Sequence, residues 1–204
     1  MSVKIEELNN IELDALREVG NIGAGNAATA LSQVLNKRID MSVPRAKVLE
    51  LSKVPEILGG AEKLVVGVYL KIYGDIQGSI MFLLPTESAE ELIETLLGES
   101  EPEGLAGEIS QSAIMEVGNI LSSSYLNALS EFANLTVVPS TPALAYDMAG
   151  ALFSTILIEL SEVSDYALLI ETEFTSDGKE IDGSFFMLPD VDSLHILLKS
   201  IGVS

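Results

Sequence analysis

Apolar residues recur at three- and four-residue spacing along two long segments, from Ile11 to about Asn36 and from about Ala106 to Asn134. That spacing is typical of amphipathic helices. Elsewhere the pattern changes to short apolar runs bounded by turn residues, which favours β-strands. Four such runs form two hairpins with turns at 74–75 and 176–178: 64–73 with 75–84, and 165–174 with 181–188. A shorter helix is predicted after each hairpin, at 86–97 and 190–201.

The two halves of the chain repeat one another. The pentapeptide EVGNI occurs at 18–22 and again at 116–120, an offset of 98 residues. The same offset pairs Pro44 with Pro142. Further on, GSIMFLLP at 78–85 resembles GSFFMLP at 183–189, where the offset has grown to 105, so the second half carries about seven extra residues. We therefore predict a single domain over residues 1–204, built from internal repeats at about 8–98 and 106–202.

Neither predicted hairpin can cover its own apolar face. Joining both hairpins into one sheet, with the two long helices against it, would bury both faces. The predicted fold class is therefore α+β. We expect one pseudo-two-fold symmetric domain, with a continuous and mostly antiparallel sheet flanked by the two long helices and by shorter helices.

A polar stripe runs along each long helix. Glu18 and Asn21 are three residues apart, so they share one helix face. The full stripe comprises Asp14, Glu18, Asn21 and Gly25 in the first helix, and Ser112, Glu116, Asn119 and Ser123 in the second. The core face of the first helix is predicted to hold Leu16, Val19, Gly20, Gly23, Ala27, Ala30 and Val34, with the glycines allowing close packing. The polar stripe is therefore predicted to be exposed, and its small neighbours would let another protein approach closely.

The stripe carries a carboxylate and an amide, which limits its chemistry. The chain has no cysteine and one histidine, His195, so no Ser/His or Cys/His nucleophilic pair lies on the stripe. One carboxylate per helix does not make a glycosidase pair, nor a metal site unless the two helices pool ligands. An amide is no base at neutral pH, but it can orient a water molecule through hydrogen bonds. Positioning the attacking water is most of the task in phosphoryl transfer, so the residues suggest a site completed by a partner that carries a cation.

The charge of the chain narrows the class of partner. The formal net charge is −20 and the eleven Lys and Arg residues are scattered, so no nucleic-acid footprint is present and anionic membranes would be repelled. The acidity either keeps an apolar, lysine-poor protein soluble or suits a partner with a Lys or Arg near its functional site. No apolar run approaches the roughly 18 residues of a membrane span, and the N-terminus lacks a signal-peptide core. We expect a cytoplasmic protein.

The spacing of these residues resembles the signature of the CheC/CheX/FliY family of phosphatases in bacterial chemotaxis. That signature is Asp or Ser, three residues, Glu, two residues, Asn, then twenty-two residues and Pro. Both halves match it without departure, with Asp14, Glu18, Asn21 and Pro44 in the first and Ser112, Glu116, Asn119 and Pro142 in the second. Two intact motifs resemble the CheC branch, since CheX has one motif and dimerises, and FliY would add a flagellar-switch domain.

The resemblance implies hydrolysis of the aspartyl phosphate on phosphorylated CheY, a receiver that brings its own Mg²⁺ and a Lys. The chain itself would bind no cofactor. Asn21 or Asn119 would orient the hydrolytic water, while Glu18 or Glu116 would pair with the receiver's Lys. The remaining motif residues are expected to support the site or to end a segment after the helix.

The resemblance also implies a complex with CheD, a receptor deamidase. Asp147, within LAYDMAG at 144–150, is a candidate docking residue, and the alternative for this segment is an irregular turn before a strand. A second functional hypothesis is a docking module for a receiver or CheD without catalysis, as in flagellar switch relatives. Because the repeat supplies internally what a dimer would supply, we expect a monomer.

Overall fold

The computed structural model describes residues 5–43, 45–98, 103–160, 166–176 and 179–202. Its helices are α1 (Asn10–Leu35), α2 (Val54–Ile57), α3 (Thr86–Leu97), α4 (Glu108–Ala133), α5 (Ala149–Leu160) and α6 (Val191–Ser200), with 3₁₀ turns at Ile5–Glu7, Leu51–Lys53 and Gly104–Ala106. Its strands are β1 (Ile39–Ser42), β2 (Ala46–Glu50), β3 (Leu64–Gly74), β4 (Gly78–Pro85), β5 (Val137–Pro139), β6 (Ala143–Met148), β7 (Tyr166–Ser176) and β8 (Lys179–Pro189). None of the helices in these ranges is long and apolar enough to cross a membrane.

All the described strands join one antiparallel sheet, in the order β1-β7-β8-β4-β3-β5. β1 and β2 pair with different parts of β7 on the same edge of the sheet, and β5 and β6 pair in the same way with different parts of β3. The two hairpins meet at the centre, where β4 pairs with β8. The edge strands of each half therefore lie on the hairpin of the other half. If each strand is exchanged for its counterpart in the other half, the order reads the same from the opposite edge. The predicted α+β class and continuous antiparallel sheet are confirmed.

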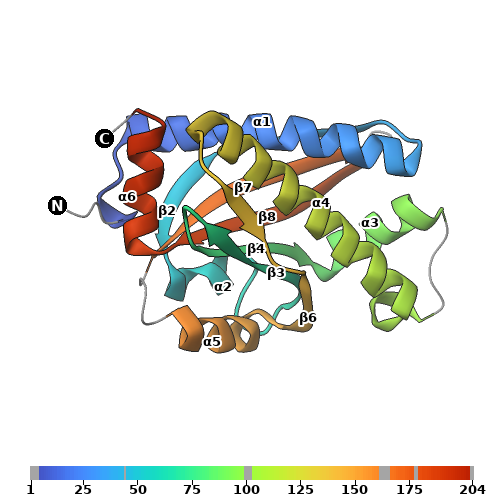
Figure 1. Cartoon of the computed structure of the whole chain (residues 1–204). Coiled ribbons are helices and arrows are strands. Elements are labelled where there is room, and N and C mark those ends of the chain that lie inside the picture. The colour runs from blue at the N-terminus through green and yellow to red at the C-terminus, as the bar shows by residue number, and fades with distance from the viewer. Residues whose placement is uncertain (1–4, 44, 99–102, 161–165, 177–178, 203–204) are drawn as a thin grey trace.

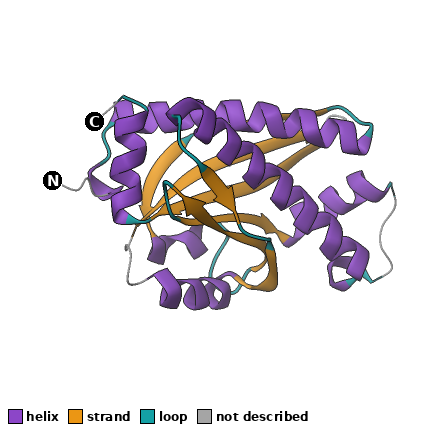
Figure 2. Ribbon diagram, in the orientation of Figure 1, coloured by secondary structure: helices purple, strands orange, loops and turns teal. Residues whose placement is uncertain are grey.

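Two apolar cores lie on opposite faces of this sheet, because successive side chains of a strand point to opposite sides. The larger core joins α1, α4, α3 and α6 to one face through residues such as Val68, Phe82 and Phe185. The smaller core joins α2 and α5 to the other face, where Phe153 meets Phe186 edge to face. Figure 1 shows α1 and α4 crossing the sheet, with α2 and α5 on the far side, and Figure 2 shows the same layers by element type.

The long helices pack closely because glycines lie where they touch their neighbours. A Cβ added at Gly23 would lie 2.7 Å from the Cα of Tyr125 in α4. One added at Gly118 would lie 2.6 Å from Val68 in β3. Close packing at the glycines of the first helix, predicted from the sequence, is confirmed at Gly23, and Gly118 makes a similar close approach that was not predicted. It holds α1 against α4 and α4 against the sheet, which fixes the orientation of both polar stripes.

Two expectations about single elements need correction. Val34 was assigned to the core face of α1, but it is 66% exposed, because the end of the helix extends beyond the sheet, and Ala30 is only half-buried. The segment that contains Asp147 is not an irregular turn before a strand: it forms most of edge strand β6 and leads directly into α5. Positions 177 and 178 of the predicted second hairpin turn lie outside the described residues.

Candidate functional site

Helix α1 places the first motif on the outer side of the molecule. Asn9 caps the helix, accepting from the backbone N–H groups of Ile11 and Glu12, while the Glu12 carboxylate accepts from the N–H of Asn9. This capping box satisfies free N–H groups in the first turn and fixes where the helix starts. Asp14 and Glu18 then follow on the exposed face. Asp14 forms an exposed ion pair of 3.8 Å with Arg17, one that contributes little stability.

Glu18 has an exposed carboxylate available to a partner. In the described part of the chain, neither Glu18 nor its counterpart Glu116 takes part in an ion pair or side-chain hydrogen bond. Helix α4 carries no Lys, Arg or His at all, so Glu116 has no basic neighbour on its own helix. Each helix thus presents an unpaired negative charge to solvent, as a site for a cation from another molecule requires.

Asn21 differs from the exposed position expected from the sequence. It is half-buried, and its side-chain Oδ1 accepts a hydrogen bond of 3.0 Å from the backbone N–H of Val43. The reason is the path of the chain after β1, which brings buried Val43 against Gly20. The amide Nδ2 is not used in this bond and can donate outward, and Oδ1 retains a second lone pair.

Val43 is the residue that the sequence interpretation missed. It directly precedes Pro44, so the twenty-two residues between Asn21 and the proline reach the residue whose N–H holds the amide. A proline disfavours helical conformation in the residue before it, which suits a backbone N–H held at the end of a strand. The fixed Asn-to-Pro spacing was the available signal. Pro44 itself lies outside the described residues.

The second motif lies on α4 in the same arrangement as the first, but its asparagine makes different contacts. Ser112 and Glu116 are exposed on α4 and Asn119 is half-buried. The position equivalent to Val43 is Thr141, which is exposed and precedes half-buried Pro142. Among the residues that the structure describes, the Asn119 side chain has no hydrogen-bond partner. The two copies therefore differ: the backbone hydrogen-bonds the amide of Asn21, whereas the amide of Asn119 has no such bond among the described residues.

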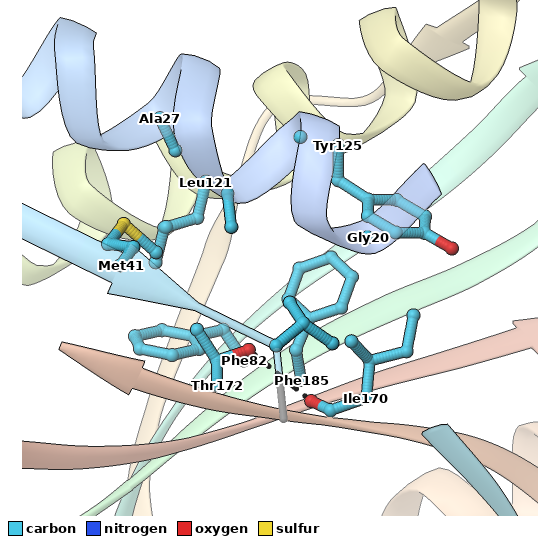
Figure 3. A pocket seen from close by; sticks show the side chains of 12 residues that line it. Gly20, Ala27, Met41, Phe82, Leu121, Tyr125, Ile170, Thr172 and Phe185 are labelled. Carbon is cyan, nitrogen blue, oxygen red and sulfur yellow. Dashed lines mark hydrogen bonds between the residues drawn. The ribbon is translucent and has the colours of Figure 1, made fainter. Parts of the chain in front are cut away.

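Gly20 and Gly23, which lie beside the first motif in sequence, border a small cavity on the inner side of α1. It measures about 20 Å³ and is lined by Gly20, Gly23, Ala24, Ala27, Met41, Val43, Phe82, Leu121, Tyr125, Ile170, Thr172 and Phe185. Figure 3 shows these mostly apolar side chains gathered between the long helices and the sheet. The Tyr125 hydroxyl donates to Met187 Sδ at 3.8 Å, and burial raises the pKa of Tyr125 above its ordinary value. The cavity has room for about one water molecule and holds no acid or base that titrates near neutral pH.

Asp147 lies five residues after Pro142 of the second motif, on edge strand β6 opposite Val65 of β3. Its carboxylate Oδ1 accepts from the N–H of Met148 at 2.7 Å. Its neighbours Tyr146 and Met148 are exposed large side chains. No group of three or more His, Cys, Asp or Glu residues within the described ranges is arranged to hold a metal ion.

Comparisons with known proteins agree with this arrangement. The model of the CheC-like family matches residues 11–48 and 109–146, one match on each helix and the strands that follow it. The chain is 42% identical to the CheY-P phosphatase CheC of Bacillus subtilis over 198 residues, covering 95% of each chain. The solved structure of Thermotoga maritima FliY has the same fold, with a TM-score of 0.77 at 22% identity, over 95% of this chain and 97% of that one. The FliM middle domain of Vibrio alginolyticus shares the fold at a TM-score of 0.64 and 13% identity, over 91% of this chain and 99% of that one. By its similarity to CheC across nearly its whole length, the chain belongs to the CheC-like family.

Proposed function

We propose that this chain is a protein phosphatase that hydrolyses the aspartyl phosphate of phosphorylated CheY. The observation that carries this proposal is the 42% identity, over 95% of both chains, to the B. subtilis protein named CheY-P phosphatase CheC. The two Glu-Asn pairs, each with an exposed carboxylate and a half-buried amide, support it, because neither copy has a nucleophile or base that would favour another reaction.

In the proposed reaction, a water oxygen attacks the phosphorus of the receiver's phosphoaspartate. The bond between phosphorus and the aspartyl oxygen breaks, releasing the free carboxylate and inorganic phosphate, and the water's protons pass to phosphate and solvent. Asn21 or Asn119 enters the receiver's site and holds the water by donating through Nδ2 and accepting at Oδ1. This lowers the barrier by placing the water in line before the reaction begins.

The carboxylate of Glu18 or Glu116 fixes the position of the receiver. Both are exposed and lack an ion-pair partner within the described residues, so a Lys beside the receiver's phosphorylation site can pair with either. Such a pair contributes little affinity in water but orients the two proteins. Mg²⁺ belongs to the receiver in this proposal.

We also propose that edge strand β6 is where CheD docks, with Asp147 as a contact. The strand's outer side lacks a paired strand among the described residues, and Asp147, Tyr146 and Met148 are exposed there. Asp147→Lys should abolish CheD binding, measured by calorimetry, while phosphate release from CheY stays as in the parent. Unchanged CheD binding would contradict this docking site.

Phosphate release from phosphorylated CheY tests the main proposal. The parent chain should accelerate release, and Asn21→Ala combined with Asn119→Ala should lose most of that acceleration. Asn26→Ala is a matched control, because Asn26 is an exposed amide on another face of α1. Unchanged release in the double variant would contradict the role of the amides. No acceleration by the parent chain, together with firm receiver binding, would instead support a docking module.

These partners are signalling proteins, so we place the chain in the cytoplasm and expect it to act as a monomer. The predicted mass in solution is 21.8 kDa by sedimentation equilibrium. A mass of twice that value would contradict the monomer.

A further inference from the structure

Each of the two long helices carries an isoleucine that faces solvent in its first turn. Ile11 is 71% exposed and Ile109 is 57% exposed, and both lie in the first turn of their helix. The two positions are 98 residues apart, the offset that also relates the motifs. An exposed isoleucine is ordinary, and exposure at equivalent positions of both copies does not by itself mark a site, since Val34 and Phe132 are exposed in the same way. What distinguishes Ile11 and Ile109 is their position relative to the motif glutamates.

Each of these isoleucines lies on the same face as the glutamate of its motif. Ile11 precedes Glu18 by seven residues and Ile109 precedes Glu116 by seven, which is two helical turns. On the other side of Glu18, four residues later, Ile22 is 40% exposed. Glu18 thus lies between two exposed apolar side chains along one stripe. The core residues Leu16 and Val19 lie on another face and are fully buried, so Ile11 is not a displaced member of the core.

The proposed receiver contact needs an apolar component. An exposed ion pair and one amide hydrogen bond add little net affinity in water, because both exchange bonds with solvent. Specific interfaces gain most affinity from apolar anchors near their centre, surrounded by polar contacts. An isoleucine beside the glutamate would supply such an anchor and would also exclude water from the carboxylate.

We propose that Ile11 and Ile109 are docking contacts that hold the phosphorylated receiver against each motif, with the receiver's apolar surface beside its Lys as the occupant. This inference rests on the proposed phosphatase function and deepens it. It commits to a receiver because the apolar side chains are continuous with the unpaired carboxylates, and because a chain of net charge −20 favours a partner that brings a cation.

Steady-state phosphate release from phosphorylated CheY tests the docking contacts with Ile11→Ala combined with Ile109→Ala. The expected result is a KM raised about tenfold with kcat within about twofold of the parent, because the interaction is lost in ground state and transition state alike. A second measurement is the Kd for a beryllofluoride-activated receiver, which should rise by the same factor.

The chain offers a matched control at the other end of the same helices. Val34 is 66% exposed and Phe132 is 49% exposed, and they too are 98 residues apart. Val34 lies sixteen residues after Glu18, which places it on nearly the opposite side of the helix. Val34→Ala combined with Phe132→Ala removes comparable exposed apolar surface and should leave KM unchanged.

The outcomes separate this inference from the function on which it rests. If the parent chain does not accelerate phosphate release from phosphorylated CheY, the proposed function fails. The docking contacts are refuted, and the phosphatase function stands, if the parent is active and the Ile11→Ala, Ile109→Ala variant leaves KM and Kd unchanged. The same holds if the Val34→Ala, Phe132→Ala control raises KM and Kd equally. A drop in kcat alone would also contradict docking. If the parent sediments as a dimer and the isoleucine variant as a monomer, the surface joins two copies of this chain and the inference is overturned.

Discussion

The side-chain oxygen of Asn21 accepts a hydrogen bond from the backbone N–H of Val43, the residue before Pro44. The bond crosses from the middle of α1 to the chain just after β1, so one side chain both links two elements and carries the amide of the motif. Val43 is buried, and its N–H would lose its partner if the amide were removed. Asn21 therefore has a structural role in addition to its proposed catalytic role, and a substitution can be chosen that separates them.

Asn21→Asp keeps an oxygen for the N–H of Val43 but loses the donor Nδ2. We expect its free energy of unfolding to stay within about 0.5 kcal/mol of the parent's. Asn21→Ala should be less stable than the parent by about 1–3 kcal/mol, because a buried N–H is left unpaired. In an Asn119→Ala background, both variants should give nearly no acceleration of phosphate release, because neither can hold the water. Urea unfolding and phosphate release are the two measurements.

Asn26→Ala serves again as the control for a helix amide without a structural bond. Equal stability of the Asp and Ala variants would show that the bond to Val43 contributes nothing to folding. Retained release by Asn21→Asp in the Asn119→Ala background would show that the amide's donor is not needed for the reaction.

Asn119→Ala should behave differently from Asn21→Ala. The Asn119 side chain has no hydrogen-bond partner among the described residues, so its removal leaves no N–H unpaired and should change the free energy of unfolding by less than about 0.5 kcal/mol. Release from the second site should still be lost. A destabilisation as large as that of Asn21→Ala would contradict the difference between the two copies.

Much of the architecture could be predicted because the long elements carry strong local patterns. The expected helix from Ile11 to about Asn36 is α1, Asn10–Leu35, and the four apolar runs became β3, β4, β7 and β8. The central strands are buried on both faces, so their sequences are nearly continuous apolar runs, and the flanking turn residues bounded them. The family resemblance rested on residue spacing, which a sequence displays directly.

The remaining features depend on tertiary contacts that local patterns do not contain. The exchange of edge strands between halves, with β1 and β2 on β7 and β5 and β6 on β3, is a pairing choice among many that fit the same runs. Helix α5 is not among the predicted helices, because it lacks a polar face that would show a helical period. The half-burial of Asn21 follows from where Val43 lies, and that position is set by the sheet.

Glu18→Gln combined with Glu116→Gln should weaken substrate binding without harming the fold. Both carboxylates are exposed and lack ion-pair partners within the described ranges, and the chain's net charge is −20, so neutralising two charges lowers self-repulsion. We expect the free energy of unfolding to stay equal or rise slightly.

KM for phosphorylated CheY should increase, and its dependence on salt concentration should become weaker, because the ion pair with the receiver's Lys is lost. Glu131→Gln, at another exposed position on α4, should leave both unchanged. A salt dependence equal to that of the parent would contradict the proposed pairing.

Gly23→Ala and Gly25→Ala should change stability in opposite directions although they lie two residues apart on α1. A Cβ at Gly23 would lie 2.7 Å from the Cα of Tyr125, and backbone cannot move aside cheaply, so we expect a loss of about 1–3 kcal/mol in the free energy of unfolding. A Cβ at Gly25 meets nothing within 4 Å, so that variant should gain about 0.5–1 kcal/mol from better helix propensity. Gly25 lies on the motif stripe, but the equivalent residue in α4 is Ser123, which is larger than Ala, so phosphate release by Gly25→Ala should match that of the parent. Urea unfolding of the two variants checks the packing, and a stabilised Gly23→Ala protein would show that α1 and α4 are not held as closely as the structure has them.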